Sequence, residues 1–434
     1  MRTTRFVSGC LVVIVLMPWR PAFAQAPTPA GDAQSLAQEI ARLRQDFEAQ
    51  QKEYRDRLAA LESRLAASSP PEAAAAAAPP ASAPAAAQVT PGVEGAGTPA
   101  PGASSAASKL FNPDIAVIGD LLGAAGRNRV NPSPALEMHE SEASFQAVVD
   151  PYARADFFVS FGEEGVELEE GFVTFTSLPG GLLVKGGKMR AAFGKVNGLH
   201  NHILPWTDRP LVTSNLVNGE DGISDAGFSV ARLIPNPWFF LEGTGQVFRG
   251  DSGELFTSSS RGDLSYVGHV RGYQDVSEST NLDIGASYAR GYNGAGLAAD
   301  DYSFVTQLYG VDATLRWKPL RRAIYNSFVG RSELIWSQRD QPSGKQHAFG
   351  YYVSGDYQLA RRWYAGARFD RSERAADASV HDTGGSLLLT FRPSEFSQVR
   401  GQYRHIHFGA EDDTAHEFLF QLQFSIGAHG AHPF

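Results

Sequence analysis

The strongest constraint on the fold of this chain is a strict alternation near its C-terminus. From Phe418 to Ile426 every second residue is large and apolar, and the residues between them are Leu419, Gln421, Gln423 and Ser425. Successive side chains of a β-strand point to opposite faces, so this period of two separates an apolar face from a largely polar one. The alternation predicts a strand in a wall that has lipid on one side and water on the other.

The same alternation recurs from Leu110 to the C-terminus. We therefore expect an all-β fold, a transmembrane antiparallel β-barrel of about 16 strands over residues 110–434. The segments with this pattern are 113–122, 137–149, 152–162, 166–177, 181–190, 225–234, 237–248, 263–273, 281–290, 302–317, 323–337, 346–358, 362–371, 383–392, 396–408 and 415–428. In the segment from Val166 the alternation shifts near Gly171, which predicts a β-bulge.

The connections between these segments differ in length according to their order. Those after even-numbered segments are short, such as Asp150-Pro151, whereas most of those after odd-numbered segments are longer, such as 191–224. A barrel with both ends in the periplasm has short turns on one side and long loops on the other. A soluble β-sandwich is not expected to segregate its connections in this way.

The N-terminus predicts export. Two arginines precede an apolar run over 6–19, and Ala22–Ala24 has the A-x-A cleavage pattern, so residues 1–24 are interpreted as a signal peptide. The run is shorter than the roughly 18 residues that a spanning helix needs, which excludes a helical membrane protein. The only cysteine, Cys10, leaves with the signal, so we expect no disulfide in the mature chain.

The charge of the chain is acidic. The formal net charge is −9, and loss of the signal with its three arginines leaves about −12, which argues against a nucleic-acid partner. The chain is 43% apolar and contains 27 phenylalanines, which is too apolar for a disordered protein.

Two segments of different character precede the predicted barrel. Residues 34–66 carry apolar residues at heptad spacing between charged flanks, which predicts an α-helical coiled coil; a lone amphipathic helix on a surface is the alternative. Residues 67–108 consist mainly of Ala, Pro, Ser, Gly and Thr, which predicts a disordered Ala/Pro-rich linker. An even strand number would place the helix in the periplasm.

The order of signal, coiled coil, linker and sixteen-strand barrel resembles the phosphate-selective porins and related outer-membrane porins with an N-terminal coiled coil. The terminal Phe434 resembles the C-terminal aromatic of bacterial outer-membrane barrels. The resemblance implies a homotrimer of water-filled channels in the outer membrane of a Gram-negative bacterium, in contact with lipid and lipopolysaccharide. It also implies that the third loop, here 191–224, folds into the lumen.

The predicted lumen differs from a phosphate-selective pore in its charges. Those porins line the channel with a dense ladder of basic residues, whereas this chain places both signs on its inward faces. The basic candidates are Arg154, Arg316, Arg331, Arg368, Arg392, Arg400 and Arg404, and the acidic ones are Asp156, Asp312, Glu333, Asp356 and Asp370. Mixed signs indicate a general or differently selective pore, so phosphate specificity does not carry over.

The long third loop supplies the candidates for a constriction. Its apolar residues, such as Trp206, would be costly to leave in water, and folding into the lumen buries them. The charged and histidine residues expected at or near the constriction are Lys195, His200, His202, Asp208, Arg209, Glu220 and Asp221. Together with Arg154, Asp156, Arg368, Arg400 and Arg404 they form the predicted pore lining.

No sequence pattern indicates catalysis. A nucleophile elbow, a phosphate loop and a helical zinc motif are all absent from the sequence, so we expect neither an enzyme nor a cofactor. His200 and His202, and likewise His405 and His407, could hold Zn²⁺, but we interpret them as polar loop or strand-end residues. The acidic residues of 163–170 are interpreted as a solvated rim, with weak bridging of divalent cations or lipopolysaccharide as the alternative.

The sequence thus predicts an outer-membrane porin for passive diffusion of small hydrophilic solutes or ions, with a periplasmic coiled coil for trimerisation or for attachment to the envelope, such as the cell wall. Two alternatives remain. One is a plugged barrel that anchors the helix as a structural or adhesive protein, and the other is an uptake protein for a metal or another specific substrate. A siderophore receptor of 22 strands with a large plug does not fit this length.

Overall fold

The computed structural model describes residues 113–162, 165–295 and 304–427. The predicted signal peptide 1–24, coiled coil 34–66 and linker 67–108 lie outside these residues, as do Glu163, Glu164 and Phe434. Within the described ranges, no helix has the length and apolar character needed to cross a membrane.

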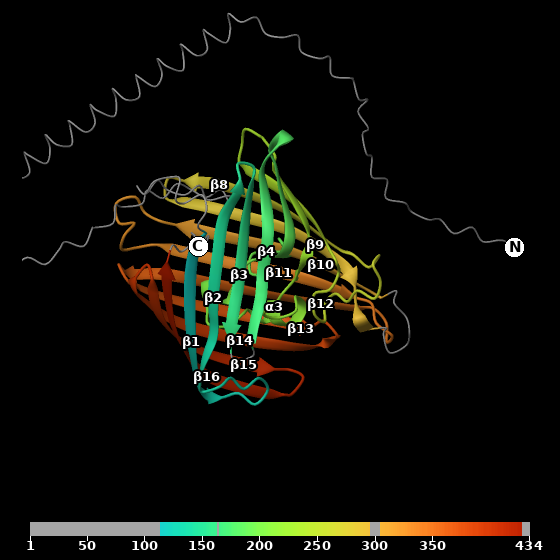
Figure 1. The fold of residues 1–434 in the computed structure, drawn as a ribbon. Helices are drawn as coiled ribbons and strands as arrows, with labels where there is room; N and C mark the ends of the chain where they lie inside the picture. The colour runs from blue at the N-terminus through green and yellow to red at the C-terminus, as the bar shows by residue number, and fades with distance from the viewer. Residues whose placement is uncertain (1–112, 163–164, 296–303, 428–434) are drawn as a thin grey trace, which may run out of the picture. The chain divides into compact units, whose positions relative to one another are not determined.

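Sixteen antiparallel strands form one closed barrel, in which each strand pairs with its neighbours in sequence and β1 pairs with β16 (Figure 1). The strands are β1 (Asp114–Arg127), β2 (Leu136–Asp150), β3 (Ala153–Gly162), β4 (Gly165–Leu178), β5 (Leu182–Arg190), β6 (Ser224–Leu233), β7 (Phe240–Phe248), β8 (Ser265–Ser277), β9 (Thr280–Tyr292), β10 (Val305–Trp317), β11 (Phe328–Arg339), β12 (Gln346–Ala360), β13 (Trp363–Arg374), β14 (Asp377–Ser394), β15 (Ser397–Phe408) and β16 (Asp413–Gly427). Short helices within the described connections include η1 (Pro179–Gly181), η2 (Asn201–Ile203) and α3 (Leu211–Leu216). The predicted barrel of sixteen strands is confirmed.

The alternation of β16 separates the two faces of the wall as predicted. Phe418 is 65% exposed on the outside of the barrel, whereas Glu417 and Gln421 are 3% and 1% exposed on the inside. β14 repeats the pattern, with Leu387 exposed and Ser386 buried. The outer face is therefore apolar and the lumen polar, which is the distribution that a lipid-facing barrel requires.

The predicted difference between the two ends of the barrel holds with three exceptions, one of which is the two-residue connection after β3, residues 163–164. The connection after β13 is only Ala375-Ala376, because β14 begins at Asp377 instead of residue 383. The added residues are mostly polar, so the apolar alternation that marks a lipid-facing strand does not extend to them. The connection after β10, residues 318–327, is longer than the other turns at its end. We refer below to the long-loop end and the short-turn end of the barrel.

Two β-bulges change which side chains face the lumen near the long-loop end. On β4 the register against β3 slips between Phe158 and Val159, which leaves Glu169 as the extra residue, two positions from the predicted shift at Gly171. On β2 the register against β1 slips between Asp120 and Leu121, which leaves His139 as the extra residue. A bulge re-aims the side chains around it, so neighbouring residues on one strand can face the same side.

The connection between β5 and β6, residues 191–223, folds into the lumen, as the sequence predicts. Its α3 packs against the inner face of β11 to β14. Trp206, which is 1% exposed, meets the ring of Tyr352 edge-on, with 5.1 Å between the ring centroids. Phe193, Val196, Leu216 and wall residues such as Phe248 and Ile335 belong to the same buried apolar cluster.

The close pairing of β4 and β5 depends on a glycine. Gly187 has φ of 144°, which side-chain-bearing residues rarely adopt, and a Cβ there would lie 2.6 Å from Phe172 Cα and closer still to the carbonyl oxygen of Gly171. We expect Gly187→Ala to lower the free energy of unfolding by about 1–3 kcal/mol because of backbone strain. Urea unfolding of the protein in detergent, followed by tryptophan fluorescence, measures this change.

Gly245→Ala on β7 is the matched control, because a Cβ at Gly245 has no neighbour within 4 Å and its φ lies outside the positive range. We expect this variant to unfold like the unmodified protein. Equal stability of the two variants would contradict the strain assigned to Gly187.

Candidate functional site

Two cavities in the lumen are lined by the inward loop and the wall within the described residues. The larger, of about 960 Å³, opens toward the long-loop end, where Pro134, Gly162 and Gly253 line it. The smaller, of about 350 Å³, lies in the short-turn half, where Leu183, Glu242 and Arg331 line it. Arg190 lines both cavities, so they approach each other at this residue. We call them the long-loop cavity and the short-turn cavity.

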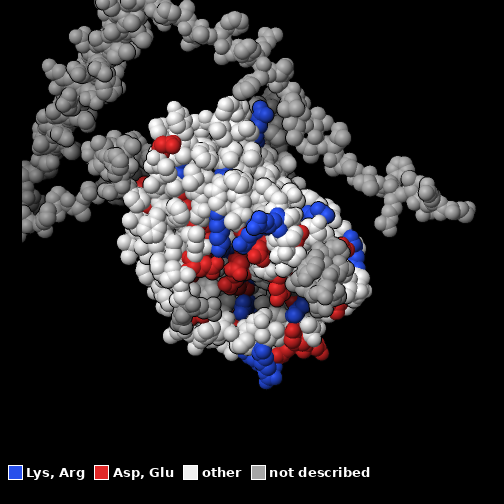
Figure 2. Space-filling model, turned by 45° about the vertical axis from the view of Figure 1, so that its right-hand side comes forward, with Lys and Arg blue, Asp and Glu red and all other residues white. Residues whose placement is uncertain are grey.

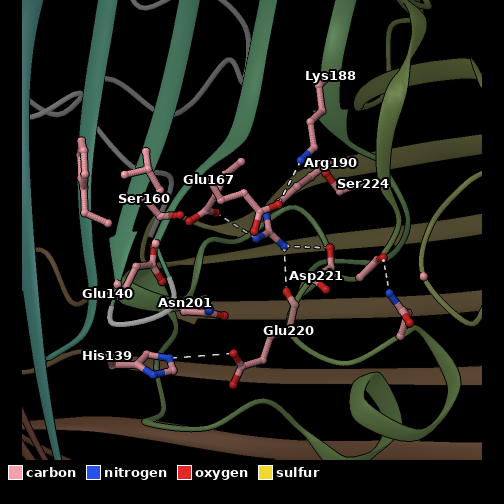
Figure 3. Close-up of a pocket in the computed structure, with 18 of the residues that line it drawn as sticks. His139, Glu140, Ser160, Glu167, Lys188, Arg190, Asn201, Glu220, Asp221 and Ser224 are labelled. Carbon is pink, nitrogen blue, oxygen red and sulfur yellow. Dashed lines mark hydrogen bonds and ion pairs between the residues drawn. The ribbon is translucent and has the colours of Figure 1, made fainter. Parts of the chain in front are cut away.

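The long-loop cavity is acidic. Its basic lining residues are Lys188 and Arg190, whereas its acidic lining residues are Glu137, Glu140, Glu167, Glu169, Glu220, Asp221 and Asp251. Figure 3 shows Arg190 in the middle of this group, where its guanidinium donates to the backbone carbonyls of Glu220 and Asp221 at 3.0 and 3.2 Å. Figure 2 shows one hollowed face of the molecule with acidic residues gathered around the hollow.

The short-turn cavity has the opposite charge. Besides Arg190, its basic lining residues are Lys185, Lys195, Arg271, Arg316 and Arg331, and its acidic lining residues are Glu170 and Glu242. Asp283 of β9 is fully buried behind this wall and forms ion pairs with Lys195 Nζ at 3.0 Å and Arg271 at 2.7 Å. Lys195 thereby fixes the start of the inward loop to the wall, while its side chain remains 21% exposed toward the cavity.

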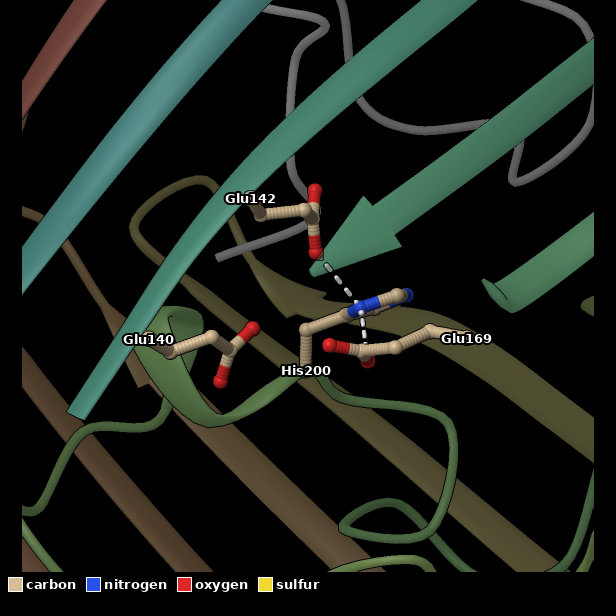
Figure 4. Close-up of side chains that lie close together, drawn as sticks. All are labelled: Glu140, Glu142, Glu169 and His200. Carbon is tan, nitrogen blue, oxygen red and sulfur yellow. Dashed lines mark ion pairs between the residues drawn. The ribbon is translucent and has the colours of Figure 1, made fainter. Parts of the chain in front are cut away.

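His200, in the inward loop, is surrounded by carboxylates from two strands (Figure 4). Its Nδ1 lies 2.8 Å from Glu142 Oε2 and 2.9 Å from Glu169 Oε2, and its Nε2 lies 3.0 Å from Glu170 Oε2. Burial alone would lower the pKa of His200, but these three carboxylates more than offset burial and raise that pKa well above its ordinary value. The imidazole can therefore carry a second proton and balance part of the surrounding negative charge.

His202 follows on the same segment and is 1% exposed. Its Nδ1 lies 3.5 Å from Glu140 Oε1 and 3.6 Å from Glu142 Oε2. The two histidines thus point toward one acidic surface built by β2 and β4, with 5.7 Å between the ring centroids.

Asp208 attaches the middle of the inward loop to β13 and β15 of the wall. Its carboxylate accepts hydrogen bonds from Arg368 at 3.0 Å, Arg404 at 3.2 Å and Gln402 at 2.6 Å. Burial would raise the pKa of Asp208, but the two guanidinium groups, helped by the Gln402 amide, hold that pKa below its usual value. The guanidinium of Arg368 also lies 4.9 Å from the centre of the Trp206 ring.

Arg209 stabilises the loop from within. Its guanidinium donates to the carbonyl oxygens of Val196 at 3.2 Å and Leu199 at 2.7 Å and to the side chain of Asn201 at 3.0 Å. Burial and the nearby charge of Arg190 lower the pKa of Arg209 to about 10. The guanidinium still carries its charge at neutral pH.

The predicted site residues fall into two groups. Lys195, Glu220 and Asp221 line the cavities. The others are mostly engaged in contacts that hold the loop or the wall: His200, His202, Asp208, Arg209, Arg368, Arg400 and Arg404 are buried or largely buried, and Arg154 pairs with Asp156 at 2.8 Å. Arg400 donates to the carbonyl oxygen of Leu204 at 3.0 Å.

Several residues of the site were missed by the sequence analysis. Glu140 and Glu142 were not singled out, and Glu169 and Glu170 were assigned to a solvated rim. The rim interpretation is wrong for these two, because they face His200 inside the barrel. The shift of alternation near Gly171 was the signal for the bulge that turns them inward. Glu167 does lie at the rim, where its side chain is 66% exposed.

The second pair of histidines lies away from the lumen. His405 and His416 face each other on the outer surface with 3.2 Å between their Nδ1 atoms. His407 Nε2 lies 3.9 Å from Asp412. They take no part in the site in the lumen.

Comparisons with known proteins identify the fold of the chain but not its activity. No family model matches the chain. An uncharacterized protein of Aquifex aeolicus is 28% identical over 387 residues, with 75% of this chain and 81% of that protein covered. Among solved structures, Pseudomonas putida OprB superposes with a TM-score of 0.53 at 12% identity, covering 74% of this chain and 95% of that one. An anion-selective porin from Comamonas acidovorans gives 0.52 at 11% identity, covering 73% and 99%. The fold is therefore that of a porin barrel.

The contacts of His200 predict that the stability of the inward loop depends on pH. Because its pKa is raised on folding, the stability that it contributes is complete below its ordinary pKa of about 6.5 and is lost as the pH rises through the raised value. We expect cleavage of the loop by added protease to increase on the alkaline side. His200→Gln should remove this increase of cleavage with pH, called the pH step below. It should also lower the stability of the loop at neutral pH by about 1–3 kcal/mol, since buried carboxylates lose a charged partner.

His269→Gln on β8 is the control, since His269 faces the lumen but bonds to Ser287 at 2.8 Å, away from the cluster around His200. It should keep the pH step of the unmodified protein. An unchanged step in His200→Gln would show that groups other than His200 set the pH dependence.

Proposed function

We propose that the protein is an outer-membrane porin that passes small hydrophilic ions or solutes by passive diffusion, with its long-loop end toward the outside of the cell. The apolar outer face of the closed barrel suits lipid, and the lumen carries polar and charged groups. The likeness to OprB and the Comamonas porin supports the same class of protein.

The observation that carries this proposal is the approach of the two cavities at Arg190. A solute entering the acidic long-loop cavity would pass Arg190 and its partner Glu169, which lie 3.1 Å apart, to reach the basic short-turn cavity. Charges in such a narrow, partly desolvated passage act more strongly than charges at a mouth. Its two halves would attract ions of opposite sign, so we propose weak selectivity instead of a single-sign pore.

Fixed contacts hold the inward loop in place. The inward loop is attached to the wall at Lys195, His200 and Asp208, and Arg209 ties the loop to itself. These groups are paired and, apart from Lys195, largely buried, so displacing the loop would leave several charges without partners in the lumen, at several kcal/mol for each buried one. We propose that the loop is a permanent constriction and not a mobile lid.

One observation favours the alternative of a plugged barrel that serves as an anchor. The apolar cluster around Trp206 and Phe193 fills part of the lumen between the loop and the wall. If it also closes the route past Arg190, the protein would not conduct. Planar-bilayer recording separates the two functions, because a plugged barrel gives no stable channels.

The charges of the two cavities predict opposite effects on ion preference. Arg316→Glu in the short-turn cavity should shift the reversal potential in a salt gradient toward cations, and Glu220→Lys in the long-loop cavity should shift it toward anions. We expect each to change the ratio of cation to anion permeability by roughly twofold or more. The measurement is the reversal potential of single channels in a planar bilayer.

Arg261→Glu provides a control, because Arg261 is exposed on the connection between β7 and β8 and lines neither cavity. We expect it to change the reversal potential little. Equal shifts from Arg261→Glu and Arg316→Glu would mean that current does not pass through the short-turn cavity. Absence of any channel would leave the anchor function.

The predicted coiled coil completes the proposal. We propose that residues 34–66 lie in the periplasm and strengthen a homotrimer of barrels, as their heptad spacing suggests. Deletion of 34–66 should then lower the temperature at which the oligomer dissociates, while the barrel stays folded. Gel mobility of heated and unheated protein in detergent measures both. An unchanged dissociation temperature would instead favour attachment of the helix to another envelope component, such as the cell wall.

A further inference from the structure

Four side chains from three segments direct ligand atoms toward one point at the inner wall (Figure 4). Glu140 and Glu142 come from β2, Glu169 from β4 and His200 from the inward loop, and one oxygen or nitrogen of each lies within 4.8 Å of all the others. Glu140, Glu142 and His200 are 6%, 1% and 5% exposed. This set combines three carboxylates with one imidazole, a mixture that occurs at protein sites for divalent transition metals.

The ring of His200 is held in the orientation that a metal ligand needs. Its Nε2 lies 3.0 Å from Glu170 Oε2, which does not belong to the four, so Nε2 can donate its proton there. When an ion replaces the proton on Nδ1, the lone pair of Nδ1 faces Glu142 and Glu169. Metal-bound histidines usually donate their second N–H to a carboxylate in this way. Glu170 is itself fixed by a hydrogen bond of 2.6 Å from the backbone N–H of Arg190.

A second and independent observation is the lack of hydrogen bonds at the atoms that meet at this point. Glu140 Oε1, Glu142 Oε2 and His200 Nδ1 are buried and make no hydrogen bond of acceptable geometry within the described residues. They do have charged neighbours, because Nδ1 lies 2.8 Å from Glu142 Oε2 and Glu140 Oε1 lies 3.5 Å from His202 Nδ1. A buried polar atom without a hydrogen bond is costly, and most such atoms have a partner. Three of them converging on one point indicate a missing central partner.

We propose that Glu140, Glu142, Glu169 and His200 bind one divalent transition-metal cation, such as Zn²⁺ or Mn²⁺. The charges agree with this assignment, because a divalent cation and the guanidinium of Arg190, 3.1 Å from Glu169, together balance three carboxylates. The imidazole nitrogen favours these ions over Mg²⁺ and Ca²⁺, which prefer oxygen ligands alone. The bound ion joins the inward loop to β2 and β4, whereas Asp208 joins the loop to β13 and β15.

The test is metal binding by the full-length protein, purified in detergent without a histidine tag and freed of metal by a chelator. We expect isothermal titration to give one Zn²⁺ per chain, and Mn²⁺ to bind at the same site with loss of its free six-line electron paramagnetic resonance signal. Bound Mn²⁺ should show nitrogen coupling from one imidazole. Added Zn²⁺ should also raise the temperature at which the inward loop becomes susceptible to protease, whereas equal Mg²⁺ should not.

Two variants remove ligands and one serves as a control. His200→Gln and Glu142→Gln should each weaken Zn²⁺ binding at least about tenfold, the loss typical of a removed ligand or supporting residue. His200→Gln should also abolish the nitrogen coupling, whereas His269→Gln should leave both binding and coupling unchanged. The shift of the barrel on gels between heated and unheated samples checks that each variant is folded.

The proposal is overturned if the unmodified protein binds no stoichiometric Zn²⁺ or Mn²⁺, or if His200→Gln binds as tightly as His269→Gln. The first result would mean that a doubly protonated His200 and Arg190 offset the carboxylates without a metal ion. None of these measurements depends on conduction, so a failure of the metal site and a failure of the proposed channel are distinguishable.

Discussion

Closure of the backbone hydrogen bonds between β1 and β16 is the constraint on which the rest of this structure depends. These strands are far apart in the sequence: Arg127 and Asp413, whose side chains are in contact, are separated by 286 positions. The two strands nevertheless pair over twelve residues of β1, from Ala116 to Arg127. In hydrocarbon each unpaired backbone group costs several kcal/mol, so an open edge is not tolerated. Once the edge is closed, every second side chain must face lipid and the rest must share one enclosed lumen. Charged groups of this chain can be placed there in large numbers only if they pair.

The inward loop supplies partners for many of the charged groups of the wall. Its attachments lie on separate parts of the wall: His200 against β2 and β4, and Asp208 against Arg368 of β13 and Arg404 of β15. A buried ion pair contributes little net stability compared with apolar packing, but removal of one partner is strongly destabilising. Such pairs therefore specify one position of the loop more than they add to its stability. The apolar cluster around Trp206 supplies the packing that the ion pairs do not.

Much of the fold could be predicted from the sequence because lipid imposes a simple rule on each strand. The alternation at Phe418–Ile426 and the order of short and long connections were enough to give sixteen antiparallel strands. The rule fails where both faces are wet, which is why the start of β14 at Asp377 was placed six residues late. The folding of 191–223 into the lumen was also predictable, since its apolar residues had no other place to be buried.

The composition of the site could be predicted only in part. His200 and Asp208 were identified as residues of the inward loop, but their partners depend on register, which residue types alone do not give. Glu169 and Glu170 are adjacent, so strict alternation would send one of them outward, and the bulge on β4 brings both to His200. Glu140 lies beside the bulge at His139 on β2.

The two bulges and the loop also explain why ion-binding groups gather in one quarter of the lumen. A regular strand offers one inward side chain in every two residues, so a dense acidic surface needs an irregularity in the wall. The bulges provide it on β2 and β4, next to the strand β5 from which the loop departs. The loop then brings His200 to that surface within ten residues of leaving β5. Sequence proximity of the bulged strands to the loop thus places the acidic surface beside Arg190, where the two cavities approach each other. Any ion that crosses the barrel past Arg190 must do so beside that surface.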